Sequence, residues 1–380
     1  MANVLEALMP KILARGLLAL RGATVMPRLV NTDYSNEAKQ KGNTIDVPIP
    51  SAIAAVDVTP GATPPANTDT AWTTVPIPLD QWKEAPFYLT DKEVGQVLTS
   101  EFLPLQASEA VKSLASAVNQ HIFAQCKDFY GFTGTPGTTP FAADITDATA
   151  IRKVLNKQLC PLDARSGVLD VDAAANALAL PAFNNNFASG DGKVITEGQL
   201  GRKLGFNWYE DQEVPTHTTT TTAGAVTVKA VNAVGVSQII VSKGAGADMA
   251  AKLGDIFTIA GDPQTYVITE NVTITAGGDS TVKIAPKLQK ATAGAEAVTF
   301  EASHVMNVAF NRFAIAFATR PLQDPITEGL GNKTLSAVDP VSGLTLRLEV
   351  SRQHKQTRFS YDILYGAKTV RRELGGRIAG

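Results

Sequence analysis

The stretch LQASEAVKSLASAVNQHIFAQCKD, residues 105–128, decides how this sequence is interpreted. Its apolar residues recur at steps of three and four, which places them on one stripe of a helix. They are Val111, Leu114, Val118, Ile122 and Cys126. About 24 residues at ~1.5 Å each give a rod of roughly 36 Å, whereas globular helices average ~11–12 residues. It is either a buried core helix of an ordinary α/β domain, which the helix alone favours, or a spine that sets the length of the molecule.

Composition limits the class of protein. The chain has 380 residues, of which 44% are hydrophobic, so it can bury a sizeable core in about two or three domains. Only 18% are charged, beside a typical ~25%, and a surface with few charges often meets other proteins. The net charge of −2 does not indicate a dedicated nucleic-acid binder. Two cysteines, Cys126 and Cys160, make no disulfide framework, so we expect them to be reduced.

Residues 1–41 are expected to form an N-terminal arm. Charged residues interrupt its apolar positions, so it is neither a signal peptide nor long enough to cross a bilayer. A short amphipathic stripe at Leu13, Leu17 and Leu20 is expected to dock. It docks either on its own domain or on a neighbouring molecule.

Residues 42–90 are expected to form a long two-armed β loop that projects from the body. Both arms carry the tetrapeptide V-P-I-P, at residues 47–50 and 75–78, and proline belongs at strand edges because it cannot donate to a ladder. An isolated two-stranded ribbon is marginal in water, so it needs a surface to settle on. That surface is a neighbouring molecule or, alternatively, its own domain. The candidate assembly contacts are Trp72, Trp82 and Phe87.

A mixed α/β domain is expected to follow the long helix. The pattern predicts a helix over 147–158 and a buried strand over 166–171, with Asp172 as the cap of the next helix. Glycines at 198, 201 and 205 resemble a phosphate-binding loop, but their spacing is not G-x-G-x-x-G and no G-K-[ST] follows. We therefore expect them to let backbones approach closely.

Residues 223–301 change character. About six short strands separated by turn signals predict a small β-barrel or sandwich, interrupted by the helix-like segment ADMAAKL at 247–253. Beyond residue 301 the sequence returns to long apolar strands. The β module is therefore expected to be inserted into the α/β domain, where chain ends meet at the surface.

The sequence contains no familiar catalytic or metal-binding motif. The four histidines, His121, His217, His304 and His354, have no metal-type spacing. We expect no catalytic residue, no cofactor and no metal. The basic residues Arg371, Arg372 and Arg377 are expected to be solvated or to pair between subunits, and the alternative is a weak contact with a DNA backbone.

Several segments together resemble the major capsid proteins of tailed double-stranded DNA bacteriophages, which have the HK97-like fold, and in particular the P22 coat-protein type. The segments run in the family's order and span nearly the whole chain. They are KGNTIDVPIP (41–50), VPIPLDQWKEAPFYLTDKE (75–93), EGQLGRKLGFNWYEDQEVPTHT (197–218), KLGDIFTIAG (252–261) and YDILYGAKTVRRELGGRI (361–378).

The resemblance implies an α+β fold of the HK97-like type with an inserted β-barrel. It implies an E-loop at 42–90, a spine-helix region of the P domain at 91–131, and an A domain whose first part is 132–222. It also implies an insertion domain at 223–301, the second part of the A domain at 302–342, and C-terminal strands at 343–380 that return to the P and A domains.

The function implied by the resemblance is that of a non-enzymatic coat protein. It self-assembles into the icosahedral head shell around the double-stranded DNA genome, and is found in the virion after assembly in the bacterial host cytoplasm. The implied partners are many copies of itself, a scaffolding protein, and a portal complex at one vertex, with no membrane. The alternative is a monomeric α/β enzyme or carbohydrate-binding protein with a β accessory domain.

Overall fold

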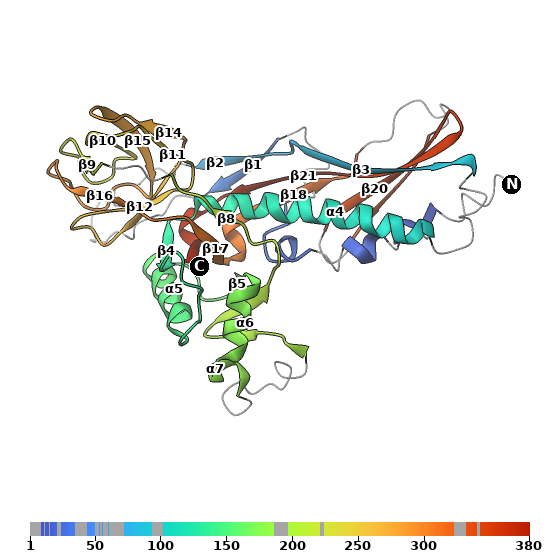
Figure 1. Cartoon of the computed structure of the whole chain (residues 1–380), viewed down its shortest axis with the longest axis horizontal. Coiled ribbons are helices and arrows are strands. Elements are labelled where there is room, and N and C mark those ends of the chain that lie inside the picture. Colours follow the sequence, from blue (N-terminus) through green and yellow to red (C-terminus); the bar gives the residue numbers. More distant parts are fainter. Residues whose placement is uncertain are drawn as a thin grey trace.

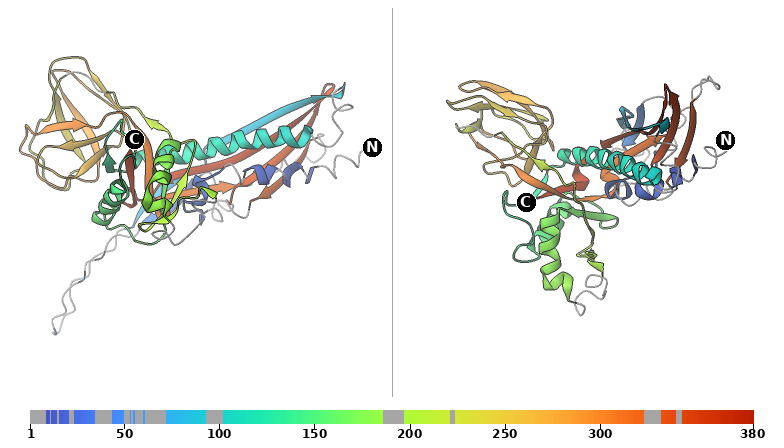
Figure 2. Two further views of the ribbon diagram at one scale, coloured as in Figure 1. Left: turned by 60° about the horizontal axis from the view of Figure 1, so that its bottom comes forward. Right: turned by 45° about the vertical axis from the view of Figure 1, so that its right-hand side comes forward.

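The computed structural model describes residues 9–10, 12–14, 16–20, 24–34, 44–49, 53, 55, 60, 72–92, 102–185, 197–220, 224–322, 332–339 and 343–380. Figure 1 shows an elongated molecule in which a long helix lies along a sheet, with a barrel at one end. Figure 2 shows from two further sides that the barrel and a lobe of shorter helices lie at the same end of that helix. The expected tip of the β loop, 54–70, lies almost wholly outside the described residues.

The long helix is α4, Phe102–Gln125, and a 3-10 turn, η2 (Cys126–Asp128), extends it. The stripe predicted from the sequence is confirmed, because all five of its members are at most 2% exposed. The helix packs on strands β3 and β21. Within it, Asn119 accepts from the backbone N–H of Met26 at 3.0 Å and donates to Asp211 at 2.7 Å. This buried amide connects the helix to two distant segments of the chain.

A five-stranded antiparallel sheet carries α4 on one face. Its order is β18-β21-β20-β19. Strands β20 and β18 pair with successive stretches of one edge of β21, and β3 pairs with the opposite edge. The N-terminal stripe lies against the same core, where Leu13 and Leu20 are buried and Leu17 is partly buried, so it docks on its own chain. The strands are β3 (Gln81–Thr90), β18 (Ile315–Arg320), β19 (Lys333–Val338), β20 (Thr345–Gln353) and β21 (Gln356–Thr369).

A two-stranded ribbon leaves this sheet. Strands β1 (Thr44–Ile49) and β2 (Thr73–Pro78) pair antiparallel, and their inward residues Ile45, Val47 and Ile77 are buried against alanines of β18. The root of the ribbon is therefore anchored on its own body. The next strand, β3, does not continue the ribbon but pairs over ten residues with β21. The projecting part thus ends near Pro78, whereas we expected residues 42–90 to form one loop.

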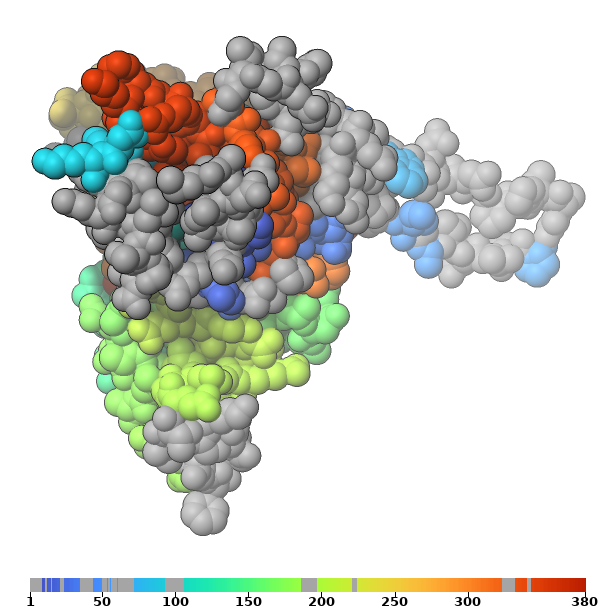
Figure 3. Space-filling model, turned by 90° about the vertical axis from the view of Figure 1, so that its right-hand side faces the viewer, coloured from blue at the N-terminus to red at the C-terminus, as the bar shows by residue number. Residues whose placement is uncertain are grey.

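A seven-stranded mixed sheet forms the second body of the molecule. It has the order β4-β22-β17-β5-β7-β6, and β8 pairs with β17. Figure 3, viewed along the long axis, shows the described residues of 146–185 and 197–217 in green to yellow-green as a lobe below the red C-terminal part of the chain. The strands are β4 (Gly131–Gly134), β5 (Arg165–Leu169), β6 (Gly201–Lys203), β7 (Phe206–Glu210), β8 (Thr216–His217), β17 (His304–Asn311) and β22 (Gly375–Ala379).

The helices of this lobe are α5 (Thr146–Lys157), α6 (Val171–Ala179) and α7 (Pro181–Asn184). The predicted helix over 147–158 and the predicted strand over 166–171 are confirmed to within about two residues. The expected cap was wrong. Asp170, not Asp172, precedes α6, and its carboxylate accepts from the backbone N–H of Asp172 at 3.3 Å. The strand ends two residues earlier than predicted, which moves the cap by two positions.

Six strands close into a barrel in the order β10-β15-β13-β12-β16-β9. The expected β module is confirmed, and it has a core of its own that includes Ile239, Phe257 and Tyr266. The segment 247–253 is not helical, because Met249–Ala251 forms β11 and pairs with β14. The six barrel strands are β9 (Val226–Val228), β10 (Gln238–Lys243), β12 (Ile256–Ile259), β13 (Thr265–Ile268), β15 (Asp279–Ala285) and β16 (Ala297–Phe300). Strand β14 (Val272–Ile274) lies outside the closed barrel and forms a two-stranded sheet with β11.

Candidate assembly interface

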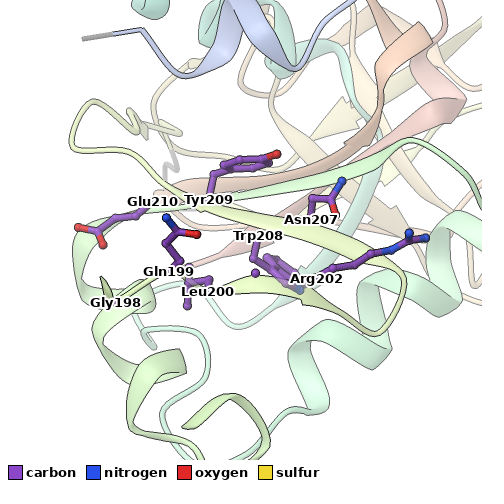
Figure 4. A pocket seen from close by; sticks show the side chains of 9 residues that line it. Gly198, Gln199, Leu200, Arg202, Asn207, Trp208, Tyr209 and Glu210 are labelled. Atoms are coloured by element: carbon purple, nitrogen blue, oxygen red, sulfur yellow. The ribbon is translucent and has the colours of Figure 1, made fainter. Parts of the chain in front are cut away.

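A cavity of about 470 Å³ lies beside the hairpin of β6 and β7. Figure 4 shows Trp208 and Tyr209 pointing to opposite sides of β7, with Arg202 and Glu210 at the two ends of the site. The described lining residues include no serine, cysteine, threonine or histidine. Among the residues that the structure describes, no group of three His, Cys, Asp or Glu side chains could hold a metal.

The glycines beside this cavity allow an unusual backbone conformation and are not needed for close packing. Gly198 and Gly201 both have φ of +67°, and a Cβ added to either would meet nothing within 4 Å. The expectation that they let backbones approach closely was therefore wrong. They adopt the left-handed conformation, which a residue without Cβ enters at little cost.

Two of the three predicted contact residues are exposed. Trp72, beside β2, is 69% exposed, and Trp82, on β3, is 62% exposed. The Trp82 indole Nε1 donates to Asp362 Oδ2 at 3.1 Å, and the same carboxylate accepts from Arg347 Nε at 3.0 Å and Nη2 at 2.5 Å. The buried ion pair thus fixes one edge of the ring while its face stays open. Large rings held in this way are typical anchors of protein interfaces.

The third candidate, Phe87, is covered by its own chain. It is only 8% exposed and stacks on Phe359 of β21, with ring centroids 5.3 Å apart. Side chains alternate across a strand, so Trp82 and Tyr88 face outward while Phe87 and Leu89 face the core. The period-2 pattern of β3 was the signal in the sequence that separates Phe87 from Trp82.

The outward face of β3 carries aromatic rings among charges that pair internally. Arg358 lies 2.5 Å from Glu84 and has its guanidinium 6.0 Å from the ring centre of Tyr88. Arg352 pairs with Asp91 at 2.5 Å, and this hydrogen bond lowers the pKa of the Asp91 carboxyl. Because these charges already have partners, the exposed rings are the groups left for contact with another molecule.

Truncation of Phe87 is expected to lower the stability of the subunit, and truncation of Trp72 is expected to leave it nearly unchanged. Phe87→Ala removes a buried ring and should lower the free energy of unfolding by about 3–5 kcal/mol. Trp72→Ser removes an exposed ring and should change it by less than about 0.5 kcal/mol. Urea denaturation of the two subunits measures both values. Equal destabilisation by the two variants would contradict the assignment of Trp72 as free surface.

The C-terminal arginines do not form the solvated cluster that we expected. Arg377, on β22, is fully buried, and burial lowers its pKa to about 10. Arg372 lies 3.7 Å from Asp128, while Arg371 lines a second cavity of about 250 Å³ at the root of the ribbon. The strand pairing of β22 with β17 and β4 places Arg377 inside the molecule, a non-local effect that its neighbours in sequence do not reveal.

No family model and no curated protein matches this sequence. Many solved structures are similar in fold, including the following two. One, from Mycobacterium phage Che8, has a TM-score of 0.51 and 17% identity, over 93% of this chain and 90% of that one. The other, the capsid structure of the cyanophage P-SCSP1u, has a TM-score of 0.51 and 12% identity, over 94% of this chain and 88% of that one. The chain therefore has the HK97-like fold, and the expected mixed α/β fold with a β-barrel is confirmed.

Proposed function

We propose that this protein is a major capsid protein that self-assembles into the icosahedral head shell of a tailed bacteriophage. The observation that carries the proposal is the HK97-like fold over nearly the whole chain, shared with the cyanophage capsid structure. Exposed tryptophans at 72 and 82, close in sequence to the ribbon strands, supply surfaces for contact with further copies. The protein acts by binding its own copies and not by catalysis, and it resides in the virion.

The parts of the chain fit the roles that this fold assigns. We assign the ribbon to the E-loop, α4 to the spine helix of the P domain, and the five-stranded sheet to the same domain. The seven-stranded sheet with its helices is the A domain. The closed barrel at 226–300 is an insertion domain, and its presence between two parts of the A domain supports the P22 coat-protein type.

The partners follow from this function. Many copies of the chain would surround each other, a scaffolding protein would guide assembly, and a portal complex would occupy one vertex. Any contact with packaged DNA would be weak and non-specific, because Arg377 is buried and only Arg371 and Arg372 of the basic cluster reach the surface. In the part of the chain that the structure describes, no helix is long and apolar enough to cross a membrane.

Size-exclusion chromatography with negative-stain microscopy of the purified full-length chain tests the proposal. We expect closed particles or rings, either spontaneously or with a scaffolding partner, because repeated heterologous contacts close under point-group symmetry. A monomer that never assembles, with or without that partner, would instead support an α/β enzyme or carbohydrate-binding protein with a β accessory domain.

A further inference from the structure

The inserted barrel sits on the body through a small apolar contact. Tyr130, directly before β4, and Phe132, within β4, pack against Ile256, Val267 and Ala285 of the barrel. The hydroxyl of Thr265 also donates to the Tyr130 carbonyl at 2.6 Å. An apolar contact of five residues is modest for holding a domain, so the polar groups around it also contribute to holding the barrel on the body. We call this contact between barrel and body, with its surrounding polar groups, the seat.

One buried arginine joins three elements at this seat. From β22, Arg377 Nη1 donates to the carbonyl of Gly254 in the barrel at 2.8 Å, and Nη2 donates to the carbonyl of Lys127 at the end of α4. Both acceptors are neutral carbonyls, and Nε has no hydrogen-bond partner among the described residues. A fully buried guanidinium without a bonded carboxylate is costly, and a further positive charge beside it would add to that cost.

Two histidines lie beside this arginine. His217 Nε2 is 2.8 Å from Asp255 Oδ1, and both side chains are buried. The second histidine, His304, donates from Nδ1 to the carbonyl of Ala302 at 2.8 Å, which fixes the neutral ring with Nε2 as an acceptor. No described residue donates to that buried Nε2. The seat therefore contains a neutral imidazole that can take up a proton but has no acceptor for it.

The groups that face His304 come from four elements. Phe132 of β4 meets it edge-on with ring centroids 5.2 Å apart, and His217 of β8 lies at 5.6 Å. The charged groups are Asp255 of the barrel, which His217 already engages, and Arg377 of β22. Burial, opposed by the Ala302 hydrogen bond and reinforced by Arg377, lowers the pKa of His304 to about 4.

We propose that this seat is an acid-released joint, in which protonation of His304 beside the buried Arg377 detaches the barrel and lets it turn against the body. The inference depends only on contacts within one chain and goes beyond the proposed capsid function. In the seated state the imidazole is neutral, and it becomes protonated once the seat opens to water. The seat is therefore stable above the ordinary histidine pKa of ~6.5 and loses stability as the pH falls from there toward about 4.

The size of the effect follows from the two protonation equilibria. With a pKa near 6.5 when open and about 4 when seated, the opening equilibrium constant rises on the order of 30-fold between pH 7.5 and pH 5. Double electron–electron resonance between spin labels at Lys287→Cys on the barrel and Lys153→Cys on α5 measures it. Both positions are exposed, and the native cysteines, Cys126 and Cys160, are buried and free.

We expect one distance at pH 7.5 and a second one that grows at pH 5. The variant His304→Phe keeps an aromatic ring against Phe132 but cannot be protonated, so it should show the first distance alone at both values. The matched control His354→Phe removes an exposed histidine and should behave as the parent. If His304→Phe fails to fold, as judged by far-ultraviolet circular dichroism, His304→Gln replaces it.

Three outcomes would overturn the proposal. The first is a single distance in the parent at pH 5. The second is a second distance in the His304 variant equal to that of the parent. The third is loss of the circular dichroism signal in step with the second distance, because that would report unfolding of the whole chain and not release of the barrel.

Discussion

Deletion of residues 54–70 is expected to leave the thermal unfolding of the subunit nearly unchanged and to reduce or abolish closed particles. The buried residues of the ribbon, Ile45, Val47 and Ile77, lie at its root and remain in the variant. Residues 50–53 and 71–72 also remain and can close the shortened hairpin between β1 and β2. The subunit therefore loses no described core contact, whereas a shell loses a projecting contact at every copy.

Two measurements on the same preparation test this prediction. Thermal unfolding of the variant subunit reports the effect on its own stability, and particle yield by microscopy reports assembly. Trp72→Ser in the full-length chain is the companion variant, since it removes one exposed ring and keeps the ribbon length. A much lower unfolding temperature would mean that the deleted segment packs on its own body. A normal particle yield would mean that the segment is not an assembly element.

The long helix and the barrel could be predicted from the sequence because local residue patterns determine both. The stripe on α4 recurs at helical spacing, so its burial could be predicted before any partner was known. The barrel was predictable because its strands are short and separated by turn residues, and because they pair mainly with one another. In both cases the sequence periodicity and the final packing agree.

Features that depend on pairing between distant segments were not predictable. The strand β3 follows the ribbon in sequence, but it pairs with β21 about 270 residues later, so Phe87 turns to the core and not to a neighbour. Arg377 looks like part of an exposed basic cluster, yet its strand lies between β4 and β17. The buried joint at His304 likewise needs four elements to meet. Such positions require the topology, which the sequence pattern of one segment does not contain.

Gly366→Ala is expected to destabilise the subunit strongly. Gly366 lies in β21 where the chain between β2 and β3 crosses it, and an added Cβ would lie 2.0 Å from the Pro78 carbonyl oxygen and 2.9 Å from its carbon. Both atoms are backbone, so no side-chain rotation relieves the clash, and β2 must move away. Overpacking of this kind costs about 1–3 kcal/mol and sometimes more, and we expect the upper end of that range.

Urea denaturation of Gly366→Ala beside Gly244→Ala tests this prediction. At Gly244 the added Cβ would lie 3.5 Å from the nearest atom, which is ordinary contact, so that variant should unfold within about 0.5 kcal/mol of the parent. Because the same clash displaces the root of the ribbon, Gly366→Ala should lose both subunit stability and particle yield. The tip deletion should lose only the yield. If the free energy of unfolding of Gly366→Ala equals that of the parent, the chain after β2 does not cross β21 closely. The root of the ribbon is then not anchored as described.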